Sequence, residues 1–436
     1  MNRDLYKQLL NWKSDLNRKP LILRGARQVG KTHLLKRFAA QEYATFVYLN
    51  FETDPKIAQL FSQTLKPSSI IENISLYINK TINAQDTLII FDEIQECPEA
   101  LNSLKYFQEE AKDFNIVSAG SLLGVKLGKN KGFPVGKVNF LDLYPLSFFE
   151  FLEAIGKEKL RHFLGSIHVL EPIPGPIHEE LLNDLKRYFF IGGMPEVVNE
   201  YLKNKDLLSI RKIQQEILIA YLLDFSKHAD GDQIMKITQV WENIPSQLAK
   251  ENKKFVFSVL RKSARGREYE TAIQWLVDAG LIHKSYCLSV PRLPLSGYKD
   301  GNAFKVFLLD VGLLSAMAKI PAKSLTEGHQ LFSEFNGALT ENFVAQSLAK
   351  HQYPLYYWTS SGVAEVDFIV EHELDLYPLE VKAGISRKKK SLLVYGNQYA
   401  PKRLLRTTAM NLKQDGNVCN IPLYLVDRLM ELARLA

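Results

Sequence analysis

The chain has 436 residues, of which 46% are hydrophobic and 24% are charged, proportions typical of a globular protein. Its length exceeds the ~250–300 residues at which a single hydrophobic core stops growing, so more than one domain is expected. Only three scattered cysteines are present, which excludes a disulfide framework, and no apolar run reaches the ~18 residues of a membrane span. These features predict a cytoplasmic protein that is not embedded in a membrane.

The formal net charge of +7 is concentrated at one end of the chain. From Glu380 onward, eleven Lys or Arg residues stand against four Asp or Glu residues, which accounts for the whole excess (11 − 4 = +7). A basic region on a near-neutral body predicts an anionic partner, and nucleic acid is the first candidate, DNA before RNA. A solvated charged face without a partner is the alternative.

Short apolar runs alternate with helical patterns over the first 150 residues, which predicts a parallel α/β sheet. Turn residues and lysines then predict a loop. The expected strands are Pro20–Arg24, Ala44–Asn50, Thr87–Phe91 and Phe114–Gly120, the first helix begins with Thr32–Phe38, and the loop covers Gly124–Gly136.

An eight-residue motif follows the first expected strand and opens the first expected helix. It satisfies G-x-x-x-x-G-K-[ST], in which backbone N–H groups and a helix N-terminus cradle phosphate oxygens. Lys31 is placed to neutralise the β- and γ-phosphates, and Thr32 to bind Mg²⁺. The sequence therefore predicts ATP and Mg²⁺ as cofactors. The predicted binding residues are Gly25, Ala26, Arg27, Gln28, Val29, Gly30, Lys31 and Thr32.

Acidic and polar residues end the third and fourth expected strands. Asp92 emerges where open α/β sheets hold their ligands, and is expected to help to hold Mg²⁺. Glu93 is expected to orient or deprotonate the attacking water. Ser121 either senses the γ-phosphate or belongs to a simple Gly-Ser turn. No arginine finger can be assigned among Arg27, Arg161 and Arg187, so a monomer and an oligomer both stay open.

The remainder of the chain suggests two further domains. Turn residues near Pro172 precede a helical region that extends to Lys250. A helix near Phe255, a second one closed by Gly280 and β-prone residues to Ser289 form a winged-helix pattern. Its Glu268–Val277 helix would either enter a groove of a duplex or contact a protein. The expected domains are residues 1–170, 171–330 and 331–436.

Several segments resemble prokaryotic AAA-superfamily ATPases that carry a C-terminal domain of unknown function. The resemblance covers nearly the full length and implies a P-loop ATPase core, a helical and winged-helix middle and a nuclease-like C-terminal fold. The segments are Pro20–Thr32, Phe91–Glu96, Ser118–Gly124, Leu143–Leu152, Gly192–Val198 and Val306–Leu314.

A second set of charged residues lies in the last third of the chain. Glu341 is expected near the start of a helix and Asp367 at the start of a strand, while Glu380 and Lys382 share one face of the next strand because side chains alternate. This set resembles the PD-(D/E)XK nuclease core, which implies an Mg²⁺ site with Asp367 and Glu380 as ligands. The alternatives are the same fold with a silent site, or an exposed cross-strand pair. The basic run Arg387–Lys390 is expected to grip phosphates or to lie in solvent.

Two functions of different classes agree with these features. One is an ATPase that acts on nucleic acid, with a C-terminal module that binds or cuts it. The other is a nucleotide-switched signalling or interaction protein, whose basic module binds a protein or RNA without cleavage. Stimulation of phosphate release by nucleic acid distinguishes the first from the second.

Overall fold

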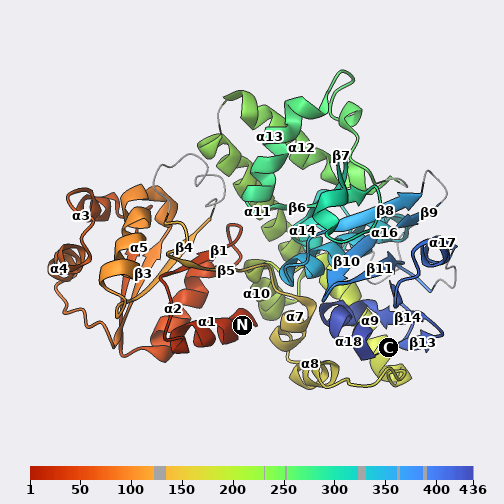
Figure 1. The fold of residues 1–436 in the computed structure, drawn as a ribbon, viewed down its shortest axis with the longest axis horizontal. Helices are drawn as coiled ribbons and strands as arrows, with labels where there is room; N and C mark the ends of the chain where they lie inside the picture. Colours follow the sequence, from red (N-terminus) through yellow and green to blue (C-terminus); the bar gives the residue numbers. More distant parts are fainter. Residues whose placement is uncertain are drawn as a thin grey trace. The chain divides into compact units, whose positions relative to one another are not determined.

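A computed structural model describes residues 1–121, 134–229, 231–250, 253–322, 330–360, 364–385 and 390–435, without the side chains of residues 228 and 330–334. It divides into two compact units (Figure 1). The N-terminal unit consists of Asn2–Tyr144 with Asp278–Gly280, and the C-terminal unit of Pro145–Val277 with Leu281–Ala436. The expected three-domain division stays a prediction. None of the helices in the described ranges could cross a membrane.

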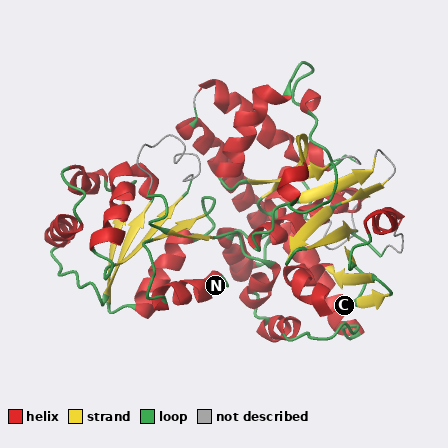
Figure 2. Ribbon diagram, in the orientation of Figure 1, coloured by secondary structure: helices red, strands yellow, loops and turns green. Residues whose placement is uncertain are grey.

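The N-terminal unit is built on a parallel sheet with helices around it (strands yellow and helices red in Figure 2). The sheet has five strands in the order β2-β3-β4-β1-β5. The predicted parallel α/β core is therefore confirmed. The sequence did not predict β5, which pairs with β1 at the edge, where Arg24 and Asp142 form a bidentate ion pair. The strands are β1 (Leu21–Arg24), β2 (Thr45–Asn50), β3 (Thr87–Asp92), β4 (Asn115–Gly120) and β5 (Asn139–Asp142).

The central strands of this sheet are buried. Every residue of β3 and β4 is buried, because helices cover both faces of a parallel sheet. Three aromatic rings, Phe51, Phe61 and Phe91, pack edge to face within the core. The helices are α1 (Leu5–Ser14), α2 (Lys31–Glu42), α3 (Gln59–Ser62), α4 (Pro67–Ile78) and α5 (Pro98–Glu110).

The first half of the C-terminal unit is helical, and the sequence predicts this pattern for the part from about residue 177 to Lys250. The helix expected near Phe255 is different: only a 3-10 turn, Phe257–Val259, forms there. The winged-helix interpretation stays a prediction. The helices of this half are α7 (Phe148–Ala154), α8 (Glu158–Gly165), α9 (Gly175–Ile191), α10 (Pro195–Asn204), α11 (Leu207–His228), α12 (Gly231–Leu248) and α13 (Gly266–Asp278).

Two sheets form the rest of this unit, in the orders β7-β6-β8-β9 and β10-β11-β12-β14-β13. The strands of the first are β6 (Ile282–Leu288), β7 (Lys299–Leu308), β8 (Tyr356–Ser360) and β9 (Ala364–Val366). Those of the second are β10 (Phe368–His372), β11 (Asp375–Val381), β12 (Leu404–Thr408), β13 (Lys413–Asp415) and β14 (Val418–Pro422). The helices are α14 (Val311–Met317), α16 (Gln330–Lys350), α17 (Lys390–Tyr399) and α18 (Leu429–Leu435).

The second sheet contains the hairpin that the sequence predicts. Strands β10 and β11 are antiparallel and pair from Phe368 with Leu379 to His372 with Asp375. Helix α17 then connects β11 to β12, and these two strands pair in parallel. Helix α16 packs against β11 and also against β6 and β7 of the first sheet. Side chains from α16 and from both sheets therefore meet around one centre.

Gly193 and Asp310 join distant segments of the C-terminal unit. Asp310 caps α14 by accepting a hydrogen bond from Leu313 N (2.9 Å), and it also accepts one from Gly193 N (2.6 Å). A Cβ atom on Gly193 would lie 2.1 Å from the carbonyl oxygen of Leu146. Only glycine allows the two backbones to approach so closely.

Replacing Gly193 by alanine is expected to destabilise the C-terminal unit by about 3 kcal/mol, the upper end of the usual cost of overpacking, because backbone atoms cannot move aside. Urea unfolding of the full chain measures the change. Gly165→Ala is the control, since no atom lies within 4 Å of a Cβ there and alanine favours the helix. Equal stability of the two variants would contradict the role of the close contact.

Candidate functional sites

The loop between β1 and α2 is shaped by residues in unusual backbone conformations. Gly25, Gln28 and Gly30 all have positive φ angles, of 148°, 66° and 95°. A Cβ atom on Gly25 would lie 2.3 Å from Leu143 O, so the loop requires glycine at this position. Gly30 precedes α2, and the free N–H groups at the start of that helix form an anion site.

Lys31 folds back over this loop. Its ammonium donates to the carbonyl oxygens of Gly25 (2.9 Å) and Ala26 (2.8 Å), and its side chain is buried. Burial lowers the pKa of Lys31 from 10.5 to about 8. The nearby carboxylates of Asp92 and Glu93 oppose this shift without cancelling it. Lys31 is therefore a cation held beside the anion site at a cost that a bound phosphate would offset.

Thr32 and Asp92 meet at the carboxyl edge of the sheet. The Thr32 hydroxyl donates to Asp92 Oδ2 (2.8 Å), and the Tyr48 hydroxyl donates to the same oxygen (2.7 Å). Asp92 ends β3 and is buried. A hydroxyl and a carboxylate side by side are hard oxygen ligands of the type that Mg²⁺ takes together with nucleotide phosphates. These two residues fit the predicted Mg²⁺ site.

Glu93 follows Asp92 in a left-handed conformation, with φ of 50°. Its Oε2 accepts hydrogen bonds from Gln95 Nε2 and from Ser121 Oγ (3.1 Å). Ser121 in turn accepts one from Arg27 Nε (3.2 Å). A carboxylate held in place by two donors is suited to orienting a water molecule.

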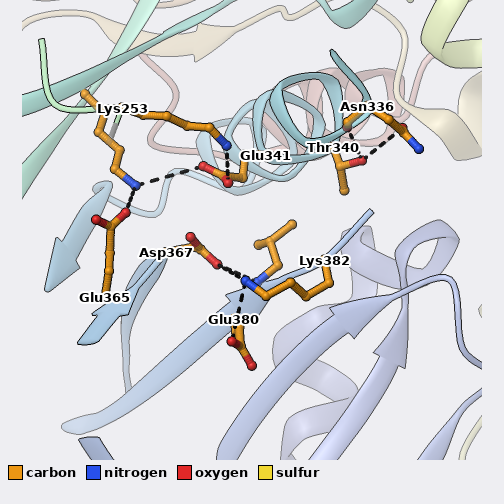
Figure 3. Close-up of polar contacts among 10 residues, drawn as sticks. Lys253, Asn336, Thr340, Glu341, Glu365, Asp367, Glu380 and Lys382 are labelled. Atoms are coloured by element: carbon orange, nitrogen blue, oxygen red, sulfur yellow. Dashed lines mark hydrogen bonds and ion pairs between the residues drawn. The ribbon is translucent and has the colours of Figure 1, made fainter. Parts of the chain in front are cut away.

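The acidic set predicted near the C-terminus is assembled in the second sheet of the C-terminal unit. Asp367 lies directly before β10, and its Oδ2 accepts a hydrogen bond from Val381 N (2.7 Å) across the hairpin. Glu380 lies in β11 and Lys382 follows it, with the Lys382 ammonium 3.5 Å from Glu380 Oε1 and 4.0 Å from Asp367 Oδ2. Figure 3 shows Glu341 of α16 facing this group. The four predicted residues therefore converge.

Four further charged residues belong to the same centre. Lys253 forms an ion pair with Glu341. Lys305 of β7 lies 2.5 Å from Glu365 Oε1 and 3.9 Å from Glu341 Oε2. Arg406 of β12 lies 3.5 Å from Glu380 Oε2. The sequence carries one signal for Lys305, which is a charge between the apolar residues Phe304 and Val306.

Burial and mutual repulsion set the charges of this centre. Burial, reinforced by the charge of Glu341, raises the pKa of Asp367 from 3.8 to about 6. Burial also opposes ionisation of Glu341, but Lys253 and Lys305 outweigh it and lower the pKa of that group. The pKa values of Asp367 and Glu341 are thus shifted in opposite directions, and Glu341 keeps its negative charge to lower pH than Asp367 does.

The residues of this centre do not fit a divalent metal in the arrangement observed. Within the described ranges, no group of three His, Cys, Asp or Glu side chains is placed to hold a metal ion. Each of the four carboxylates instead lies against a cation of the chain itself. The predicted ligands Asp367 and Glu380 share Lys382.

Two other sequence features can be placed only in part. The basic run Arg387–Lys390 and the loop Gly124–Gly136 lie largely outside the described residues. Of the candidate arginine fingers, Arg161 pairs with Glu153, and Arg187 Nη1 lies 2.8 Å from Asp184 Oδ1.

Comparison with protein-family models assigns the first site. Residues 17–152, which include the loop, Lys31, Asp92 and Glu93, match a model described as an AAA domain. This part of the chain is an AAA-type P-loop ATPase domain. Downstream of the AAA domain, residues 182–324 and 336–426 match two domains of unknown function, DUF8612 and DUF4143.

Solved structures show weaker likenesses. The Walker-type ATPase PABY2304 of Pyrococcus abyssi is 14% identical, with a TM-score of 0.43, and the match covers 72% of this chain and 95% of that one. The Aeropyrum pernix ORC1 protein in complex with DNA is 12% identical (TM-score 0.28; 73% and 91% covered). The Thermotoga maritima RuvB Holliday junction branch migration motor is 15% identical (TM-score 0.29; 68% and 91% covered). No curated protein matches. Since these TM-scores lie below 0.5, they carry no argument about function.

Nucleotide affinity of the AAA domain is expected to fall above pH 8. Only the protonated Lys31 attracts phosphate, and its pKa of about 8 means that binding must take up a proton at higher pH. The Kd for ATP should be constant between pH 6.5 and 7.5 and then rise about tenfold per pH unit. Fluorescence titration with a labelled ATP analogue measures it.

Lys31→Arg is the control for this pH dependence, because guanidinium stays protonated throughout the range. Whatever affinity this variant keeps should not change between pH 7 and 9.5. A flat profile for the unsubstituted chain up to pH 9.5 would contradict the proposed titration of Lys31.

Proposed function

We propose that this chain is a Mg²⁺-dependent ATPase whose C-terminal unit binds nucleic acid, DNA before RNA. The observation that carries the ATPase is the meeting of Lys31, the Thr32–Asp92 pair and Glu93 at one edge of a parallel sheet. In this arrangement each group required for phosphoryl transfer to water has a candidate residue.

The chemistry follows from these residues. On ATP binding, Lys31 exchanges the carbonyl oxygens of Gly25 and Ala26 for phosphate oxygens. The negative charge of the phosphates compensates the hydration that the ammonium loses on burial. Thr32 and Asp92 would hold Mg²⁺, which neutralises charge on the phosphates. Glu93 orients the attacking water, and Gln95 and Ser121 fix the position of its carboxylate.

Nucleic acid as the partner is supported by charge. The whole net charge of the chain arises from Glu380 onward, and binding to a phosphate backbone requires such a local excess. The acidic centre beside this region supports binding over cleavage, because its carboxylates are already engaged by cations. A nucleotide-switched interaction protein is the second candidate, supported by the same basic region, since that region could equally bind a protein.

Phosphate release measured with and without DNA or RNA tests the proposal. Stimulation by DNA supports it, whereas slow, unstimulated turnover with tight nucleotide retention supports the switch. Thr32→Val, which removes the hydroxyl beside Asp92, is the control for release by a contaminating enzyme. Release that persists in this variant would refute the assignment of the site.

Cleavage is tested separately. Plasmid and single-stranded DNA are incubated with the chain and Mg²⁺ or Mn²⁺, and nicking is compared with that of Asp367→Ala. Equal behaviour of the two proteins supports a module that binds without cutting. Nicking that Asp367→Ala abolishes would instead establish a nuclease.

A further inference from the structure

Lys305 is a buried cation that the ATPase does not use. It lies in β7 between Phe304 and Val306, and only 1% of its side chain is exposed. Its ammonium contacts the carboxylates of Glu365 and Glu341, and it lies 4.8 Å from the centre of the Tyr357 ring. Burying an ammonium ion so completely is costly unless carboxylates compensate its charge. Here two carboxylates do so.

The centre around Lys305 is balanced by the chain alone. Among the residues that the structure describes it contains four carboxylates and four cations, so four negative and four positive formal charges cancel. The carboxylates are those of Glu341, Glu365, Asp367 and Glu380, and the cations are Lys253, Lys305, Lys382 and Arg406.

One carboxylate oxygen of Glu341 is placed as a metal ligand would be. Glu341 Oε2 is buried and accepts no hydrogen bond, and it forms an ion pair with the Lys305 ammonium at 3.9 Å. That separation is too long for a hydrogen bond, so Glu341 Oε2 faces the positive charge of Lys305 without accepting a hydrogen bond from its ammonium. A buried carboxylate oxygen directed at a positive charge is arranged as a ligand of a metal ion would be.

We propose that the Lys305 ammonium takes the place of a divalent cation in this centre, as an internal counter-ion that keeps metal out. Lys253 assists by neutralising the other oxygen of Glu341. The centre is thus a masked metal site: the removal of Lys305 takes away the cation that Glu341 Oε2 faces, and leaves this oxygen open to a metal ion. This inference deepens the proposed binding role of the C-terminal unit and is independent of ATP hydrolysis.

Terbium luminescence tests the proposal on the full chain. Tb³⁺ reports on sites for hard cations, and an ion in the place of the Lys305 ammonium would lie near Tyr357, whose excitation would sensitise its emission. The assay is performed in an Asp92→Asn background, which removes the carboxylate of the predicted Mg²⁺ site in the AAA domain. Lys305→Met, which keeps the length of the side chain and removes its charge, is compared with the parent.

Lys305→Met should gain one site that binds Tb³⁺ at least about tenfold more tightly than any site in the parent. Addition of Glu341→Gln should abolish that gain. The same affinity in the parent and in Lys305→Met, or a gain that survives Glu341→Gln, would overturn the proposal.

A second variant covers a failure of Lys305→Met to fold. The single change Lys305→Met leaves the Glu365 carboxylate without its counter-ion, and this unpaired charge is its main cost in stability. In the double variant Lys305→Met, Glu365→Gln, the side chain at position 365 is neutral, so that cost is absent. Mn²⁺ should raise the Tm of this double variant and leave that of the parent unchanged. No rise in the double variant, or an equal rise in both, would refute the masked site. A failed ATPase would appear only in the phosphate-release assay, which uses the unsubstituted chain.

Discussion

Replacement of Glu93 by glutamine is expected to reduce ATP turnover by roughly 10²–10⁴-fold while ATP remains bound, because the amide keeps the shape of the carboxylate but cannot take a proton from water. Its carbonyl oxygen can still accept the hydrogen bond that Ser121 donates to the Glu93 carboxylate, so the local structure should be preserved. Phosphate release and equilibrium binding of a labelled ATP analogue measure the two effects.

Lys31→Ala is the matched comparison for this variant. It removes the cation beside the anion site, so that both binding and turnover should be lost. The different outcomes of the two variants separate holding the phosphate from activating water. Normal turnover of Glu93→Gln would show that another group orients the water.

Replacement of Arg406 by methionine is expected to destabilise the C-terminal unit by about 3–5 kcal/mol. Arg406 is 2% exposed and lies 3.5 Å from Glu380 Oε2, an oxygen that is buried and accepts no hydrogen bond. Without the guanidinium this carboxylate would keep only Lys382 as a cationic partner in the described contacts. Urea unfolding of the full chain, monitored by tryptophan fluorescence, measures the loss.

Two further variants show whether the loss arises from an unpaired buried charge. Glu380→Gln combined with Arg406→Met should recover part of the stability, because the group left behind is then neutral. Lys402→Met breaks the ion pair with Asp375, where the lysine side chain is 71% exposed, and should change stability by less than the error of the measurement. Equal losses in Arg406→Met and Lys402→Met would contradict the argument.

The AAA domain could be predicted closely because its signals are local. The motif Gly25–Thr32 combines glycines, a lysine and a helix start within eight residues, and the apolar run Thr87–Phe91 ends in Asp92. Short-range patterns of this kind determine strand, loop and helix with little help from the rest of the chain. The edge strand β5 escaped prediction, because its four residues are only partly buried or exposed and show no apolar run.

Local sequence patterns could not identify the residues that hold Asp92 and Glu93 in position. Tyr48 and Gln95 contact Asp92 and Glu93 through hydroxyl and amide groups that occur in any strand or turn. The helix expected near Phe255 is a single 3-10 turn, because Phe255 pairs its backbone N–H with Phe304 O across to β7 instead of with its own helix. Such pairings depend on partners that are distant in sequence.

The sequence by itself determined the phosphate-binding loop, the acidic pair after β3, and the set Glu341, Asp367, Glu380 and Lys382, since residue type and spacing define each of them. Only the tertiary structure decided the state of the C-terminal centre. Lys253, Lys305 and Arg406 reach it from a loop and two strands that lie far apart in the chain. Charge balance inside a protein depends on distance and burial, and neither is written in the order of the residues.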